Sequence, residues 1–158
     1  MGLTVSHGCY DGGYGGFMMM REGIAHAAGV PLLLMEGFYK PPYQPSVEWA
    51  MPREGGPLCH DANGPMLYNY IERVTEWLPI KWESLDDDIV LALLNHSDTD
   101  GEIAAEDCAP LADRLAELLP RIPDALGNWP KDEWRKRTQV FVDGLRFAAE
   151  RGEAVEFY

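Results

Sequence analysis

The chain has 158 residues, within the usual domain length of roughly 100–200 residues, and its 46% hydrophobic content is enough to build a buried core. Its formal net charge of −13 repels nucleic-acid backbones and anionic membranes, so neither is expected as a partner. The same charge favours cations and basic protein partners.

The cysteines and the N-terminal residues bear on the compartment. Three cysteines without a CxxC spacing predict neither a disulfide framework nor a zinc knuckle, and they favour a reducing compartment. The start of the chain lacks a basic segment followed by an apolar one, and no apolar run reaches about eighteen residues. We therefore expect a cytoplasmic protein without a membrane partner, and the sequence leaves open whether it forms a homo-oligomer.

The first forty residues predict a strand, a turn, a helix and a second strand. Residues 3–7 alternate apolar and polar side chains, which is typical of an edge strand, and glycines follow. From Phe17 to Ala28 the apolar residues keep helical spacing, and Gly29 is placed to end this helix. Residues 32–39, LLLMEGFY, are apolar and aromatic and predict a buried strand.

The middle of the chain predicts a long loop and two further helices. Residues 40–65 are rich in proline and glycine and show no periodicity, which is typical of a functional loop. Helical spacing returns over residues 66–78. Ser84 and Asp87 resemble a capping box, which predicts a third helix that continues to His96.

The last fifty residues predict two more helices and a terminal strand. A fourth helix is expected from Ala109, because Pro110 suits a first turn, and a fifth is expected over 134–149, ended by Gly152. The tail 153–158 alternates and is placed to pair with the N-terminal strand. Residues 1–158 are thus predicted to form one helix-dominated α+β domain of about five helices, with a small sheet from the N-terminal, 32–39 and C-terminal strands.

The stretch NHSDTDGEIAAED, residues 95–107, resembles the calcium loop of an EF-hand, with Gly101 at the position of the sharp turn. Imidazole is a poor calcium ligand and suits zinc, manganese or iron better, so we expect weak calcium binding or another divalent cation. Completing such a site would need a remote ligand from His7, His60 or Asp61. The predicted metal ligands are His96, Asp98, Asp100 and Asp107.

Two other interpretations of this stretch stay open. In one, Asp98 or Asp100 caps the following helix and Gly101 supplies a positive φ. In the other, the stretch lines a pocket for an organic ligand. Ten acidic residues and no basic one lie between Lys81 and Arg114, so a cation or a basic partner would relieve their repulsion.

The segment SHGCYDGGYGGF has five glycines in twelve residues but matches no phosphate-loop motif. Its aromatic and polar side chains suit a pocket for a planar small molecule, and the alternative is a turn whose tyrosines cover the core. Cys9 and His7 could act as nucleophile and base, although their spacing on a strand requires no contact. The predicted ligand-binding residues are His7, Cys9, Tyr10, Asp11, Tyr14, His60 and His96.

Several motifs together resemble a small family of uncharacterised proteins from phages, prophages and actinobacteria. These motifs are MGLxVSHxC, LLLMEGFY, LPIKW, LLNHSDxDGEI and FxDGLRxA, and they span nearly the whole chain. The resemblance implies a phage or bacterial cytoplasmic setting and carries no assigned activity. By analogy, small phage proteins of this kind include ones that sequester the nucleotide signals of host immune systems.

Three functions follow as hypotheses. The first is a non-catalytic protein that binds a small polar molecule, such as a nucleotide-derived immune signal. The second is a metal-dependent hydrolase in which His96, Asp98 and Asp100 hold a cation that activates water. The third is an inhibitor whose acidic face binds a basic protein partner.

Overall fold

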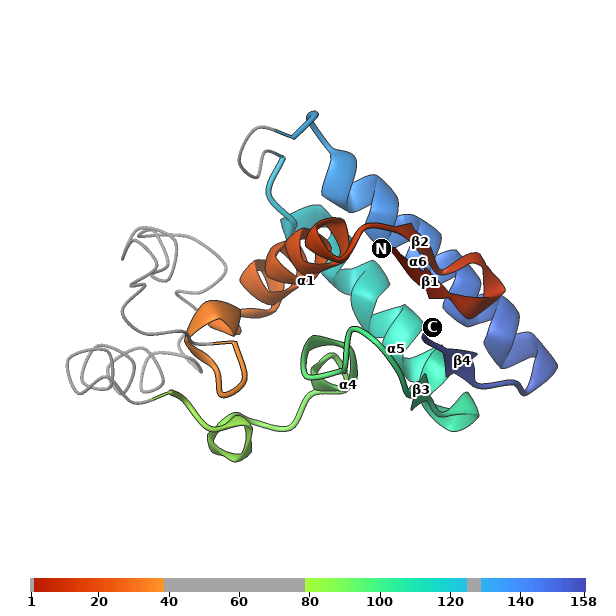
Figure 1. Cartoon of the computed structure of the whole chain (residues 1–158), viewed down its shortest axis with the longest axis horizontal. Helices are drawn as coiled ribbons and strands as arrows, with labels where there is room; N and C mark the ends of the chain where they lie inside the picture. Colours follow the sequence, from red (N-terminus) through yellow and green to blue (C-terminus); the bar gives the residue numbers. More distant parts are fainter. Residues whose placement is uncertain (1, 39–78, 125–128) are drawn as a thin grey trace.

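The computed structural model describes residues 2–38, 79–124 and 129–158, and it has an α+β fold dominated by helices (Figure 1). The described α-helices are α1 (Tyr14–Ala28), α4 (Leu91–Leu94), α5 (Ala105–Leu118) and α6 (Glu133–Arg151). The strands are β1 (Leu3–Val5), β2 (Tyr10–Gly12), β3 (Glu102–Ile103) and β4 (Val155–Glu156). Short 3₁₀ turns are η1 (Ser6–Gly8), η2 (Leu32–Leu34), η5 (Trp82–Ser84) and η6 (Leu119–Arg121). The predicted loop 40–65, with His60 and Asp61, and the whole of the predicted helix 66–78 lie outside the described residues.

The core is built where α5 and α6 pack along each other and α1 packs against both (Figure 1). Each helix buries one stripe of apolar side chains at helical spacing, as an amphipathic helix must in order to remove that face from water. The stripes are Phe17, Met20 and Ile24 on α1, Leu111, Leu115 and Leu118 on α5, and Trp134, Phe141, Leu145 and Ala148 on α6.

Two small antiparallel sheets lie at one side of these helices. One pairs β1 with β2, and the other pairs β3 with β4. The C-terminal tail connects them, because Val5 forms a bridge with Phe157, and the backbones of Thr4 and Tyr158 exchange hydrogen bonds of 3.0 and 2.9 Å. The predicted pairing of the tail with the N-terminal strand is therefore confirmed, and β3 is the tail's further partner.

Two predicted helices agree closely with the structure. The first begins at Tyr14, one turn earlier than expected, and ends at Gly29 with a left-handed φ of 75°. The last ends at Gly152 with a φ of 65°. Glycine suits both ends because it adopts this conformation without the steric cost of a Cβ atom.

Three local predictions were wrong. The described residues 32–38 of the predicted strand 32–39 form no buried strand, since Leu34 and Met35 donate backbone hydrogen bonds to residues three positions earlier, and within this range only Met35 bridges to Ile80. The third helix is limited to α4, because Ser84 lies in a 3₁₀ turn and its hydroxyl donates to the Lys81 carbonyl instead of capping a helix. The glycine-rich segment was predicted to be a turn, and in the structure it contains the strand β2.

Candidate functional site

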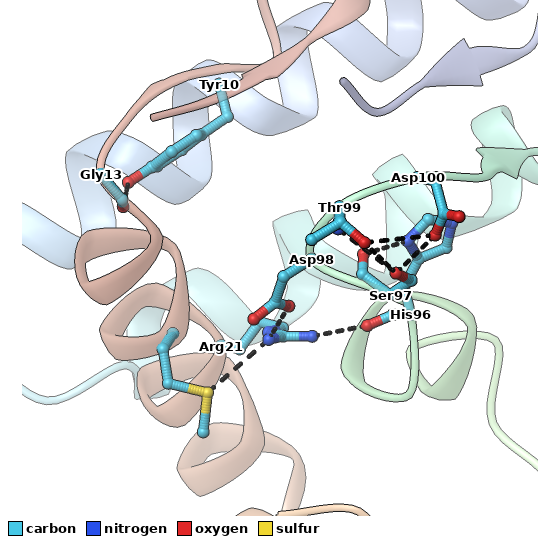
Figure 2. A network of polar contacts seen from close by, with 9 residues as sticks. Tyr10, Gly13, Arg21, His96, Ser97, Asp98, Thr99 and Asp100 are labelled. Carbon is cyan, nitrogen blue, oxygen red and sulfur yellow. Dashed lines mark hydrogen bonds and ion pairs between the residues drawn. The ribbon is translucent and has the colours of Figure 1, made fainter. Parts of the chain in front are cut away.

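A buried arginine on α1 holds the acidic turn of residues 96–100 (Figure 2). The Arg21 side chain is 0% exposed. Its Nη1 donates to the His96 carbonyl at 2.8 Å, and its Nη2 forms an ion pair with Oδ1 of Asp98. Nη2 also lies 3.6 Å from the sulfur of Met18. A guanidinium without solvent needs such partners, because a buried charge is costly unless it is paired.

Aromatic rings complete the surroundings of this guanidinium. Its Cζ lies 4.7 Å from the ring centroid of Phe17 and 5.1 Å from that of Phe38, within the range of cation–π attraction. Burial lowers the pKa of Arg21, and the Asp98 carboxylate opposes this shift. Nε has no hydrogen-bond partner within the described parts of the chain, so one donor of the fork is left over.

Side-chain hydrogen bonds within the turn fix its shape. The Ser97 hydroxyl donates to Oδ1 of Asp100 at 2.7 Å and accepts the backbone N–H of Thr99 at 3.2 Å. Gly101 has a φ of 100°, which confirms the predicted positive φ at this glycine. A Cβ at this position would also lie 3.2 Å from the His96 ring, so the ring would have to shift by a few tenths of an ångström.

The His96 ring stacks on the C-terminal tail. Its centroid lies 4.0 Å from that of Phe157, with 26° between the planes. Its Nδ1 lies 2.7 Å from the Ser97 carbonyl and therefore carries the proton, because a carbonyl can only accept. The ring is half-buried, so one part of it still reaches solvent.

The predicted metal ligands do not converge. Asp98 pairs with Arg21, Asp100 accepts from Ser97, and Asp107 lies in the first turn of α5. Over residues 2–38, 79–124 and 129–158, no three His, Cys, Asp or Glu side chains are grouped as a metal site would need. Among the described residues, the contact that holds this turn is the ion pair and hydrogen bond from Arg21.

The helix-cap interpretation of the acidic turn was wrong. Helix α5 begins at Ala105, earlier than the predicted start, and its N-cap is Ala104 without a side-chain cap. Asp98 and Asp100 therefore do not cap it. Glu106 and Asp107 in the first turn favour the positive end of the helix dipole instead.

The predicted residues of the glycine-rich segment separate into core and surface. Tyr10 is 4% exposed, packs edge-on against Phe17 at 5.2 Å, and donates its hydroxyl proton to the Gly13 carbonyl at 2.9 Å. Burial raises the pKa of Tyr10 above its ordinary value. Tyr14 is half-buried against the core, and Asp11 is exposed. Tyr10 thus covers the core, as the alternative interpretation of this segment expected.

Cys9 and His7 are not paired. Cys9 is buried against α6, whereas His7 contacts Ser6 and Glu153. Burial raises the pKa of the Cys9 thiol to about 12. Since the thiolate is the nucleophile, the burial of Cys9 and its raised pKa both disfavour a nucleophilic role.

The carboxylates after Lys81 are partly neutralised by arginines. Arg114 holds Asp88 through Nη2 at 2.8 Å and Nε at 3.0 Å, and Arg21 holds Asp98. The sequence shows no basic residue within this stretch, and its partners come from α1 and α5. The exposed remainder includes Glu83, Asp86, Asp87, Asp100, Glu102 and Glu106.

Sequence reasoning missed Arg21, Ser6, Glu153 and Phe157. Arg21 occurs in MMMREG, where a charged residue next to methionines reads as the solvent side of a helix. Its place four residues after Phe17 and three before Ile24, on the same helical face, was the signal of a buried position. No sequence pattern near Phe157 or Glu153 identifies them as site residues, because their contact partners lie at the other end of the chain or in the acidic turn.

Comparison of the chain with family models, curated proteins and solved structures finds no match. None of the described helices is long and apolar enough to cross a membrane.

Proposed function

We propose that the chain binds a small polar ligand with a phosphate or similar anionic group, and that the binding site at Arg21 is non-catalytic. The observation that carries this proposal is the Arg21 guanidinium, which is fully buried, keeps an unused Nε donor among the described residues, and is covered by the 36%-exposed Asp98 side chain. A planar guanidinium fork matches phosphate as well as carboxylate geometry. In this proposal the Asp98 carboxylate occupies, in the ligand-free chain, the position beside Arg21 that the anionic group of the ligand takes on binding.

The rings beside Arg21 supply the apolar part of the site. Phe38 contacts the guanidinium and packs edge-on against Trp82 at 6.1 Å, and both rings are half-buried. A planar base stacks favourably on such rings, while its phosphate reaches the arginine. A nucleotide derivative combines both features. The resemblance to phage proteins adds the specific candidate, a nucleotide-derived host immune signal that the protein sequesters.

The experiment is native mass spectrometry of the purified chain after incubation with the small-molecule fraction of bacterial cells, beside its denatured mass. We expect an added organic mass that Arg21→Lys loses, because lysine keeps the charge but not the planar fork. Ligand released chemically unchanged supports sequestration. A bare native mass contradicts the proposal, and one transition metal per chain that His96→Ala loses supports the metal-dependent hydrolase instead.

An acidic interaction surface is the second candidate. Seven of the ten carboxylates between Lys81 and Arg114 are exposed, the six named above and Asp113, and they lie within the 96–101 turn and on both sides of it in the sequence. A basic protein partner would find complementary charge there, and such association weakens as salt screens it.

A further inference from the structure

A serine, a histidine and a glutamate form a continuous hydrogen-bonded relay near the chain termini, apart from the arginine site. Oγ of Ser6 lies 2.8 Å from Nδ1 of His7, and Nε2 of the same ring lies 2.8 Å from Oε2 of Glu153. The fold brings these residues together from positions 146 apart in the sequence.

The proton positions of the relay follow from its neighbours. Ser6 Oγ accepts the backbone N–H of Glu156 at 2.9 Å, so the hydroxyl proton is free to point at Nδ1 of His7. Nε2 then carries the ring proton and donates it to Glu153. Hydrogen bonds from His7 and Arg151 hold the pKa of Glu153 below its ordinary value, so this carboxylate stays ionised.

The backbone of His7 makes the contact with its own neighbour feasible. Successive side chains of an extended chain point to opposite faces, which would separate Ser6 from His7. His7 instead has a left-handed φ of 57° and ψ of 18°, a conformation that is uncommon for a residue other than glycine. Such backbone conformations cluster at active sites, where they are part of the mechanism.

We propose that Ser6, His7 and Glu153 are a nucleophile, a general base and a positioning carboxylate that hydrolyse an ester with an apolar acyl group. The roles are those of a serine hydrolase relay, with the two imidazole nitrogens exchanged. The His7 side chain is 14% exposed, and the ring of Phe147, a half-exposed residue, lies 6.0 Å away and offers an apolar contact for the acyl group.

The chemistry uses only these groups and water. Ser6 Oγ attacks the ester carbonyl carbon while its proton passes to His7 Nδ1, and the negative charge develops on the carbonyl oxygen. The bond to the alcohol breaks, and the alcohol leaves with the proton from Nδ1. Water then attacks the acyl-serine and gives a proton to Nδ1, and Ser6 recovers that proton as the carboxylic acid departs.

A fluorophosphonate probe tests the nucleophile in the full chain. We expect one adduct per chain, on Ser6, formed as Oγ displaces fluoride from phosphorus. His7→Ala should slow labelling at least about 100-fold, the contribution of a general base. Ser84→Ala is the control, because that exposed serine donates to a backbone carbonyl and should leave labelling unchanged.

Hydrolysis of p-nitrophenyl butyrate tests the positioning role of Glu153. Glu153→Gln should lower kcat about tenfold with KM and the thermal midpoint unchanged, because the glutamate is partly exposed and orients the ring without touching substrate. Absence of labelling in the folded wild-type chain overturns the proposal, as does labelling that His7→Ala leaves intact. Neither result bears on anion binding at Arg21.

Discussion

Gly144→Ala should lower the free energy of unfolding by about 3 kcal/mol, which is at the upper end of the range for overpacking. A Cβ at Gly144 would lie 2.5 Å from Sγ of Cys9 and 2.9 Å from both its Cα and its backbone N. The sulfur could rotate away from the added methyl group. The backbone atoms cannot move without shifting the segment that connects η1 with β2, to which they belong. The added methyl group must therefore separate the N-terminal hairpin from α6.

Urea denaturation measures this effect through the transition midpoint. Gly15→Ala is the matched control, because a Cβ at that helical position meets nothing within 4 Å. It should leave stability unchanged or raise it by up to about 0.5 kcal/mol, since alanine favours the helix. Equal midpoints for Gly144→Ala and the wild type would show that the hairpin does not pack on α6 as described.

Arg21→Met should cost about 3 kcal/mol and loosen the turn of residues 96–100. Removing one partner of a buried ion pair leaves the other uncompensated, at a cost of roughly 3–5 kcal/mol, and the partial exposure of Asp98 places the expected effect at the lower end. Methionine fills similar space between Phe17 and Phe38. Most of the loss therefore reports the charge and its hydrogen bonds rather than a cavity.

Two measurements separate the parts of this prediction. The urea midpoint gives the stability, and amide hydrogen exchange at residues 97–101 gives the local opening of the turn. Arg137→Met is the control, because Arg137 pairs with Glu133 at 2.7 Å on the partly exposed side of α6, where a pair contributes about 0.5 kcal/mol or less. Equal losses for both variants, with exchange unchanged in the turn, would contradict the account.

The sequence predicted what local patterns encode. The apolar spacing of Phe17, Met20 and Ile24 predicted α1. Gly29 and Gly152 predicted where α1 and α6 end, because helix periodicity and left-handed caps depend on neighbouring residues in the sequence. The fold class, α+β with small sheets, was predicted from the same local patterns. The strand prediction for 32–39 was wrong over the described residues 32–38, because an apolar run of this length fits a turn as well as a strand. Backbone hydrogen bonds to residues three positions earlier make this segment a turn.

The two sites are formed by contacts between residues that lie far apart in the sequence, and local patterns do not predict such contacts. Arg21 and Asp98 are separated by 77 positions, and His7 and Glu153 by 146. The sequence pattern singled out His7, His96 and Asp98 as candidate site residues, and their contact partners decide which chemistry these residues can take part in. Asp98 and the backbone carbonyl of His96 are bound by Arg21, a cation that the spacing of the acidic stretch does not reveal.

The central claim is that Asp98 competes with a ligand anion for Arg21, and a titration with pyrophosphate and with ADP tests it most directly. Isothermal titration calorimetry should show Asp98→Asn binding about tenfold more tightly than the wild type, because the internal competitor loses its charge while keeping its size. Asp100→Asn removes the same charge from the same turn without touching Arg21, and should change affinity by less than about threefold at physiological salt. Equal affinities for the two variants, or no binding of either anion by Asp98→Asn, would contradict the account.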